Sequence, residues 1–223
     1  MNFDLHSWLE NFTNEILKHF DKRVLFIGYQ GSYKRGEAAP NSDVDMVVIL
    51  DKADIEDLKI YRQIVQNLPH SEKACGFFGG SQEVINWPKS DIFQLIYDTA
   101  PLYGNLDNIA PKITKEDVKT AIKNGAANIY HAAVHSFLYD KDKKSSLTEL
   151  FKGTFFVLQA LYFYKTKNYI CTKKELLPLL QNQDKEILQL CIDRKNFAQH
   201  NDEEIEAAYN KLILWASALI KTF

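Results

Sequence analysis

Gly31 and Ser32, followed by Asp43 and Asp45, are the residues whose types and spacing point most directly to chemistry. Alternate residues of a β-strand share a face, so Asp43 and Asp45 would project together, roughly 7 Å apart along the strand. Two carboxylates held this close repel each other unless a cation lies between them. Mg²⁺ is the natural cation, because it prefers oxygen ligands and is commonly held by one or two carboxylates together with substrate phosphates.

The glycine–serine pair provides a place for phosphate groups. Gly31 and Ser32 follow the apolar run RVLFIGY, and glycine permits a ligand to approach the backbone closely. The backbone N–H groups and the Ser32 hydroxyl can then bind phosphate oxygens. An anion cradle beside a metal clamp is what phosphoryl-type transfer needs, because catalysis there is mainly positioning and charge neutralisation.

The elements that must position these residues are strands and helices in the first half of the chain. Short β-branched and aromatic runs predict strands at residues 23–29, 43–50, 74–79 and 91–97. Apolar residues at helical spacing predict helices at residues 4–20 and 55–68. Ser81, followed by Gln82 and Glu83, predicts the cap of a short helix.

The second half of the chain has a different pattern, beginning after Pro101, Gly104 and Pro111. The spacing of its apolar residues and its cap residues both indicate helices along almost all of this half. The helices are predicted at residues 114–139, 146–165, from 172 onward, 184–200 and 203–221. These patterns predict an α+β domain over residues 1–105 and an all-α domain over residues 106–223.

The segment GSYKRGEAAPNSDVDMVVIL, with the strand before it, resembles the signature of the polymerase-beta-like nucleotidyltransferase superfamily. The likeness covers residues 23–49 and includes every defining position of the motif. It implies an α+β fold in which a small nucleotidyltransferase domain, with a mixed β-sheet flanked by helices, precedes an all-α helical bundle. It also implies that Gly31 and Ser32 bind the triphosphate, with Arg35 assisting, and that Asp43 and Asp45 bind Mg²⁺.

A third carboxylate is less clearly marked. Enzymes of this superfamily usually have another acidic residue on a neighbouring strand, which completes the metal site or acts as general base. Asp91 opens the apolar run DIFQLIY, and Glu83 precedes an apolar pair at a spacing similar to that of aminoglycoside nucleotidyltransferases. Asp98 lies at the end of the same run as Asp91. All three stay candidates, as does the absence of a third acid.

The stretch FKGTFFVLQALYFYKTKNYICTKKELLPLL resembles the helical domain of two-domain aminoglycoside nucleotidyltransferases. The resemblance implies Mg²⁺-dependent transfer of a nucleotide from an NTP, expected to be ATP, to an acceptor hydroxyl, with release of pyrophosphate. The expected acceptor is a small molecule such as an aminoglycoside-type antibiotic, so a role in antibiotic resistance is expected. Several family members place the acceptor between two subunits, which makes a homodimer a further expectation.

An alternative function comes from Arg194 and His200, whose spacing resembles the Arg-x(4–6)-His motif of HEPN domains. HEPN-like helical bundles often accompany minimal nucleotidyltransferases. The alternative is a toxin–antitoxin-type protein that AMPylates a protein hydroxyl, binds nucleotide without turnover, or cleaves RNA as a ribonuclease. An Arg and a His beside a phosphate would act as charge stabiliser and acid/base.

The composition limits the classes of partner and compartment. A formal net charge of −2 gives no general attraction to nucleic acid, so nucleic acid is not an expected partner. No apolar run reaches the roughly 18 residues of a membrane span, and no signal peptide is recognisable, so no membrane is expected. The three cysteines lack metal-ligand spacing and are typical of free thiols in a reducing compartment. Together these patterns predict a cytoplasmic protein.

Overall fold

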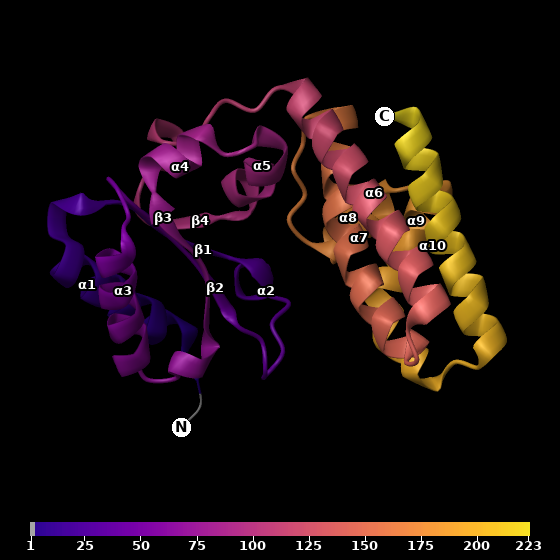
Figure 1. Cartoon of the computed structure of the whole chain (residues 1–223), viewed down its shortest axis with the longest axis horizontal. Helices are drawn as coiled ribbons and strands as arrows, with labels where there is room; N and C mark the ends of the chain where they lie inside the picture. The colour runs from indigo at the N-terminus through magenta and orange to yellow at the C-terminus, as the bar shows by residue number, and fades with distance from the viewer. Residues whose placement is uncertain (1–2) are drawn as a thin grey trace. The chain divides into compact units, whose positions relative to one another are not determined.

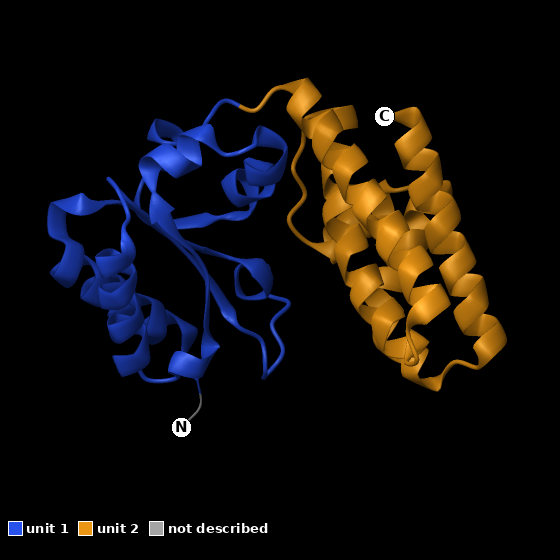
Figure 2. Cartoon of the chain, in the orientation of Figure 1, with its two compact units in different colours: residues 1–112 blue, residues 113–223 orange. Residues whose placement is uncertain are grey.

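The computed structural model describes residues 3–223, and the chain divides into two compact units (Figure 2). The first ends at Lys112 and the second begins at Ile113. The units are defined by their internal contacts, so independently folding domains over residues 1–105 and 106–223 stay a prediction. Each unit is described by itself below.

A four-stranded mixed sheet forms the centre of the first unit, with the strand order β3-β2-β1-β4 (Figure 1). The strands are β1 (Val24–Gln30), β2 (Val44–Leu50), β3 (Ala74–Gly80) and β4 (Ala100–Gly104). Strand β1 is antiparallel to both β2 and β4, and β2 is parallel to β3. β3 and β4 therefore end the sheet on its two sides. The mixed sheet expected from the sequence is confirmed.

Helices flank this sheet. They are α1 (Leu5–Phe20), α2 (Gly31–Lys34), α3 (Ile55–Asn67), α4 (Ser81–Asn86) and α5 (Lys89–Asp98), with 3₁₀ turns η1 (Asp21–Arg23), η2 (Ser71–Lys73) and η3 (Leu106–Asn108). The short helix predicted near Ser81 is present as α4. Ser81 is not its cap, because its hydroxyl donates to the carbonyl of Asp51 at 2.9 Å and the cap position belongs to Gly80.

Strand β2 is covered on both faces. Met46 and Val48 pack with Phe12 of α1 in a core that α1 and α3 close on one side. Val47 and Ile49, which alternate with them, are also completely buried. Figure 1 shows α1 and α3 on one side of the sheet and α4 and α5 on the other. A nearly continuous apolar run is the sequence that a strand buried on both faces requires.

The strand predicted at residues 91–97 is wrong, because these residues lie in helix α5. A run of seven mainly apolar residues fits a buried strand or a buried helical turn equally well. Ile92 and Phe93 are buried and Asp91 is exposed, which is the pattern of one helix face. Pro88 directly before the helix is the start signal that distinguishes the two cases. The fourth strand instead lies at β4, after the helix.

The second unit is a bundle of helices. They are α6 (Lys115–Tyr139), α7 (Lys143–Thr166), α8 (Lys173–Leu176), α9 (Asn182–Asp193) and α10 (Asp202–Thr222), with 3₁₀ turns η4 (Leu177–Leu179) and η5 (Arg194–Gln199). Helix α6 packs along α7 and α10, and α9 packs on α7 (Figure 1). Helix α6 begins with a capping box formed by Thr114 and Asp117. The all-α second half is therefore confirmed.

One helix of the bundle differs from expectation. The predicted helix at residues 184–200 ends at Asp193, and the remaining residues form the 3₁₀ turn η5. None of the helices within residues 3–223 combines the length and hydrophobicity that crossing a bilayer requires.

A partly buried ion pair joins the residue before β1 to α3. The Arg23 guanidinium donates to both carboxylate oxygens of Asp57, at 2.6 and 2.8 Å, and also to Asp51 at 3.1 Å. Asp57 is only 4% exposed. The hydrogen bonds from Arg23 hold the pKa of the Asp57 carboxyl below its ordinary value. The bidentate geometry makes this the strong form of such a pair.

Replacing Asp57 with asparagine should lower the free energy of unfolding by about 2 kcal/mol near neutral pH. The cost is smaller than for a fully buried pair because the Arg23 side chain is 35% exposed. The folded-state pKa lies below the unfolded value near 3.9, so the stabilisation is present above about pH 4 and lost as the pH falls through the folded-state pKa. Urea unfolding of both proteins should therefore show a difference that shrinks in acid. A pH-independent difference would contradict this account.

Candidate functional site

The site is built where β1 ends and the chain turns at once into α2. Gly31 adopts a φ of +75°, a conformation that glycine reaches without steric cost. Gln30, just before it, pairs with Asp45 of β2 across the antiparallel ladder. A Cβ atom on Gly31 would fall on the Oδ2 oxygen of Asp45. The backbone of the glycine–serine turn therefore lies directly against the Asp45 carboxylate.

Asp43 and Asp45 flank a core residue. Val44, between them, is completely buried in the core beneath α1, whereas Asp45 is half-buried and Asp43 is exposed. Alternation along the strand directs the two acids away from that core. Within the described residues, the hydroxyl of Ser32 makes no hydrogen bond. A hydroxyl, the turn backbone and two acids are thus gathered at one end of the β1–β2 pair.

Arg35 is held by carboxylates. Its Nη1 atom donates to Asp98 Oδ2 at 2.5 Å, and its Nε atom donates to Glu37 at 3.4 Å. Lys34 donates to the other oxygen of Asp98 at 3.2 Å. Arg35, expected from the resemblance to assist with phosphates, is therefore engaged within the protein, and Asp98, a candidate third acid, is its buried counter-ion.

The loop between α2 and β2 has its own support. Lys73 donates to the carbonyl of Pro40 at 2.8 Å and to that of Ser42 at 3.2 Å. Ser42 in turn accepts through its hydroxyl from the backbone of Ala39 at 2.9 Å. These bonds fix the chain immediately before Asp43. Neither Lys73 nor Asp98 stood out in the sequence as a support for this site.

The other two candidate acids lie elsewhere. Glu83 belongs to α4, which follows Gly80, and Gly80 pairs with Leu50 at the far end of β2. Five residues of strand separate that end from Asp45, a distance of about 16 Å. Asp91 lies in the first turn of α5, seven residues before Asp98 and about 10 Å from it along the helix axis. Among the described residues, neither forms a three-acid group with Asp43 and Asp45 that could hold a metal ion.

The residue in register with Asp45 on the neighbouring strand β3 is Cys75. Strand β3, ACGFFGG, contains no acidic residue. The position where an acid on an adjacent strand was expected is therefore occupied by an exposed cysteine. Within residues 3–223, no group of three or more His, Cys, Asp or Glu side chains is close enough to hold a metal ion by itself.

The donor set nevertheless fits Mg²⁺ in the way that a nucleotide substrate would bring it. Mg²⁺ is usually held by one or two carboxylates, with phosphate oxygens and water completing its octahedral shell. Asp43 and Asp45 are two such carboxylates, and the turn that could hold phosphate touches one of them. The residues present thus match a metal that enters with its nucleotide.

Residues 11–79 match the family of nucleotidyltransferase domains. This range contains Gly31, Ser32, Asp43 and Asp45, so the matched region is the one whose geometry is described above. The first unit carries a nucleotidyltransferase domain. The expected nucleotidyltransferase domain is confirmed, and the match supports a nucleotidyltransferase enzyme. The roles expected for the glycine, the serine and the acidic residues stay predictions.

Solved structures extend the comparison beyond this domain. Spectinomycin adenyltransferase AAD(9) from Enterococcus faecialis, crystallised with ATP and spectinomycin, aligns with 96% of this chain and 100% of its own, at a TM-score of 0.60 and 16% identity. At that identity the likeness shows the fold alone. A toxin–antitoxin structure with AMP-PNP aligns with 58% of this chain and 94% of its own, at a TM-score of 0.33 and 17% identity, and carries no argument. A comparison with curated proteins gave no match.

The helical unit contains the second pair of residues singled out in the sequence. Arg194 opens the 3₁₀ turn η5 and donates to the carbonyl of Cys191 at 2.8 Å. His200 follows the turn and packs edge-on against Phe197. Six residues of 3₁₀ helix separate the two by about 12 Å along the axis. A ribonuclease role for Arg194 and His200 stays a prediction.

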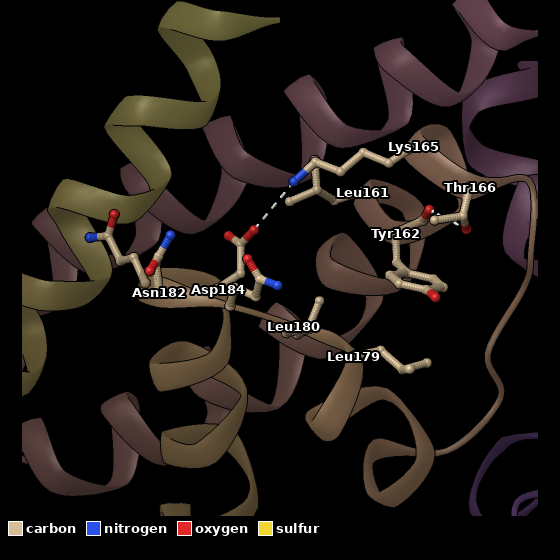
Figure 3. Close-up of a pocket in the computed structure, with 10 residues that line it drawn as sticks. Leu161, Tyr162, Lys165, Thr166, Leu179, Leu180, Asn182 and Asp184 are labelled. Carbon is tan, nitrogen blue, oxygen red and sulfur yellow. Dashed lines mark hydrogen bonds and ion pairs between the residues drawn. The ribbon is translucent and has the colours of Figure 1, made fainter.

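A pocket of about 400 Å³ lies within the same unit, between α7 and the segment from η4 to the start of α9 (Figure 3). Lys165 forms an ion pair with Asp184 at 3.5 Å, and Trp215 of α10 donates to the same carboxylate at 2.9 Å. Figure 3 shows Tyr162 and Leu179 on the side away from Asn182. Asp184 thus links α7, α9 and α10, and none of the candidate residues of the nucleotidyltransferase domain lines this pocket.

Replacing Gly31 with alanine should weaken binding of Mg²⁺–ATP to the nucleotidyltransferase domain by roughly tenfold or more, equivalent to about 1.4 kcal/mol. The new methyl group would displace the Asp45 carboxylate, and a non-glycine residue at this φ adds strain of order 1–3 kcal/mol. Isothermal titration calorimetry would measure the affinity, and thermal unfolding the strain.

Gly36→Ala is the matched control. Gly36 has a similar φ of +68°, but a Cβ there would meet nothing within 4 Å. It should reproduce the backbone strain and leave nucleotide affinity close to that of the unaltered protein. Equal losses of affinity in both variants would show that strain alone, and not the contact with Asp45, is responsible.

Proposed function

We propose that the protein transfers a nucleoside monophosphate from an NTP, with ATP as the expected donor, to the hydroxyl of a small-molecule acceptor and releases pyrophosphate. The acceptor class proposed is a hydroxylated cationic antibiotic of the aminoglycoside or aminocyclitol type. The proposal assigns Gly31 and Ser32 to the triphosphate and Asp43 and Asp45 to Mg²⁺. We expect the enzyme to act in the cytoplasm, where NTPs are available.

The observation that supports this proposal most directly is the contact between Gly31 and Asp45. In this contact the turn proposed to bind phosphate lies against the carboxylate proposed to bind Mg²⁺, at adjacent strand ends. Catalysis of phosphoryl-type transfer depends mainly on positioning the substrates and on neutralising charge at the same place. A turn and a carboxylate that were merely near in sequence would not meet that requirement.

The reaction can be written from these residues. The turn at Gly31 and the Ser32 hydroxyl hold phosphate oxygens, and this orients the α-phosphorus toward the acceptor. The acceptor oxygen attacks that phosphorus, the bond to the bridging oxygen of the β-phosphate breaks, and pyrophosphate leaves with the bonding electrons. Mg²⁺, when bound, neutralises charge on the triphosphate. The acceptor proton passes to solvent in this scheme, because β3 offers no carboxylate beside Asp45.

The choice of a small cationic acceptor rests on two observations. The chain aligns over nearly its whole length with a spectinomycin adenyltransferase that was crystallised with ATP and spectinomycin. The net charge of −2 also does not oppose a cationic ligand, as a strongly basic protein would.

A second candidate is a regulator that binds nucleotide without turnover. The observation in its favour is Cys75, since an acid on the strand beside Asp45 was expected to complete the site. Without a base, catalysis has to depend on positioning and on the metal. Protein AMPylation is a third outcome that the same assay can detect.

Pyrophosphate release should require Mg²⁺ and both strand acids. Asp43→Asn and Asp45→Asn should each lower the rate by about a hundredfold or more, because each removes a preorganised charge that faces the triphosphate. Asp51→Asn is the matched control, since Asp51 directly follows the other end of β2 and is exposed. Circular dichroism would confirm that every variant folds. An active Asp43→Asn enzyme would refute the site assignment.

The acceptor is identified by measuring pyrophosphate release with each of the four NTPs, alone and with spectinomycin, aminoglycosides and lincosamides. Release that depends on one acceptor and disappears in Asp45→Asn supports the proposed function and names the substrate. Mg²⁺-dependent ATP binding without release would favour the silent regulator. Labelling of a protein from radioactive ATP would favour AMPylation instead.

Glu83→Gln and Asp91→Asn should both keep pyrophosphate release within about threefold of the unaltered enzyme, since effects of surface charges this remote are small. Both acids are exposed, and among the described residues neither forms a metal-binding group with Asp43 and Asp45. Steady-state kinetics with the acceptor found above would test this. A loss of a hundredfold in either variant would restore that residue as the third acid.

A further inference from the structure

The helix α2 has a single hydrophobic anchor, the half-buried Tyr33, which packs against the core beneath α1. It has four residues, Gly31–Lys34, and none of them is buried. An isolated helix this short is not stable in water, so contacts with other elements must hold it. Because α2 begins with the glycine and serine assigned to the triphosphate, whatever fixes α2 also fixes the proposed phosphate cradle.

Asp98 provides two of the polar contacts. Its two oxygens bind two different cations of the turn, Oδ1 with Lys34 at 3.2 Å and Oδ2 with Arg35 at 2.5 Å. The side chains of Asp98, Arg35 and Lys34 are 7%, 8% and 16% exposed. Buried charges are tolerated only when paired in good geometry, so each of the three constrains the others.

The residue after Asp98 adds a second tie. The Thr99 hydroxyl lies 3.1 Å from the side-chain oxygen of Gln30, the N-cap residue of α2, and shares its one proton between that oxygen and the backbone carbonyl of Leu95 at 2.5 Å. The junction between α5 and β4 therefore contacts both ends of α2. It contacts Gln30 just before the helix, and Lys34 and Arg35 where the helix ends. Two consecutive residues in the chain make both ties.

We propose that Asp98 is a positioning residue that sets the nucleotide affinity of the cradle by holding α2 against Asp45. This inference rests on the proposed function, because it assumes that Gly31 and Ser32 bind the triphosphate. Both oxygens of Asp98 are bound by cationic side chains. Its role is therefore to orient the turn, and not to act as the general base that takes the proton of the acceptor hydroxyl. It acts through Lys34 and Arg35 on the backbone of the cradle.

The same pairing offsets the positive charge of the turn. Lys34 and Arg35 lie beside the proposed triphosphate site in sequence, yet their charges are directed to a buried carboxylate. The cradle then recognises phosphate by backbone N–H groups and a hydroxyl, and depends on their exact placement more than on net charge. Loss of Asp98 should consequently weaken nucleotide binding although it removes a negative charge from the site.

The test compares Asp98→Asn with Asp57→Asn. Both replace a buried carboxylate that is bound by arginine in the first unit, but the Arg23–Asp57 pair adjoins the opposite end of β1. The readouts are the Kd for Mg²⁺ with a non-hydrolysable ATP analogue, and the KM for NTP and for acceptor. Unfolding of each variant is measured in parallel.

Asp98→Asn should raise the Kd and the KM for NTP by roughly tenfold or more, with a smaller change in kcat and in the acceptor KM. Asp57→Asn should destabilise the fold and leave all these constants unchanged. An unchanged nucleotide affinity in folded Asp98→Asn would overturn the inference. Equal weakening in both variants would overturn it as well, because it would reflect global destabilisation.

Arg35→Lys keeps the charge and removes the planar fork, and it provides the measurement if Asp98→Asn does not fold. It should raise the Kd for nucleotide by about threefold to tenfold, and no change would overturn the inference. If the unaltered protein itself binds no nucleotide, the proposed function fails. If it binds nucleotide and the Asp98 and Arg35 variants bind equally well, only the positioning role fails.

Discussion

The contact between the backbone of Gly31 and the carboxylate of Asp45 is the constraint on which the rest of the site depends. It requires a residue without a Cβ atom at a positive φ, and it requires β1 and β2 to pair so that Gln30 lies opposite Asp45. A slip of one residue in this register would turn Asp45 toward the core and Val44 away from it. The buried alternate residues of β2 prevent such a slip, so the core beneath α1 also fixes the chemistry.

The supports of the site come from segments that are distant in sequence. Asp98 lies 63 residues after Arg35, and Lys73 lies 31 residues after Ser42. The edge helices and strands that carry them thus act on the loop between β1 and β2 from both sides. A nucleotidyltransferase domain of this kind depends on its whole sheet, and not only on the hairpin-like unit that carries the recognisable motif.

This arrangement explains which parts were predictable. The β1–α2–β2 unit could be predicted because its glycine, serine and two aspartates are ordered along the chain and flanked by strand patterns. The partner of Arg35 could not be predicted, because an ion pair between residues far apart in the chain leaves no periodic pattern in the sequence. The short apolar run at residues 91–97 fits a strand and a helix equally well, so the sequence predicts the wrong element there and, with it, the wrong surroundings for Asp91 and Asp98. The helices of the second half were easier to predict, because the cap residues Thr114 and Thr172 mark where two of them begin.

Strand β4 has a consequence for how the sheet ends. Its second residue, Pro101, lies opposite Gly28 of β1 and has no backbone N–H. A further strand laid along β4 would find no donor at that position, and proline is found at such borders because it discourages chains from joining edge to edge. Strand β4, which begins directly after Asp98 and Thr99, thus also disfavours self-association of the protein through the edge of its sheet.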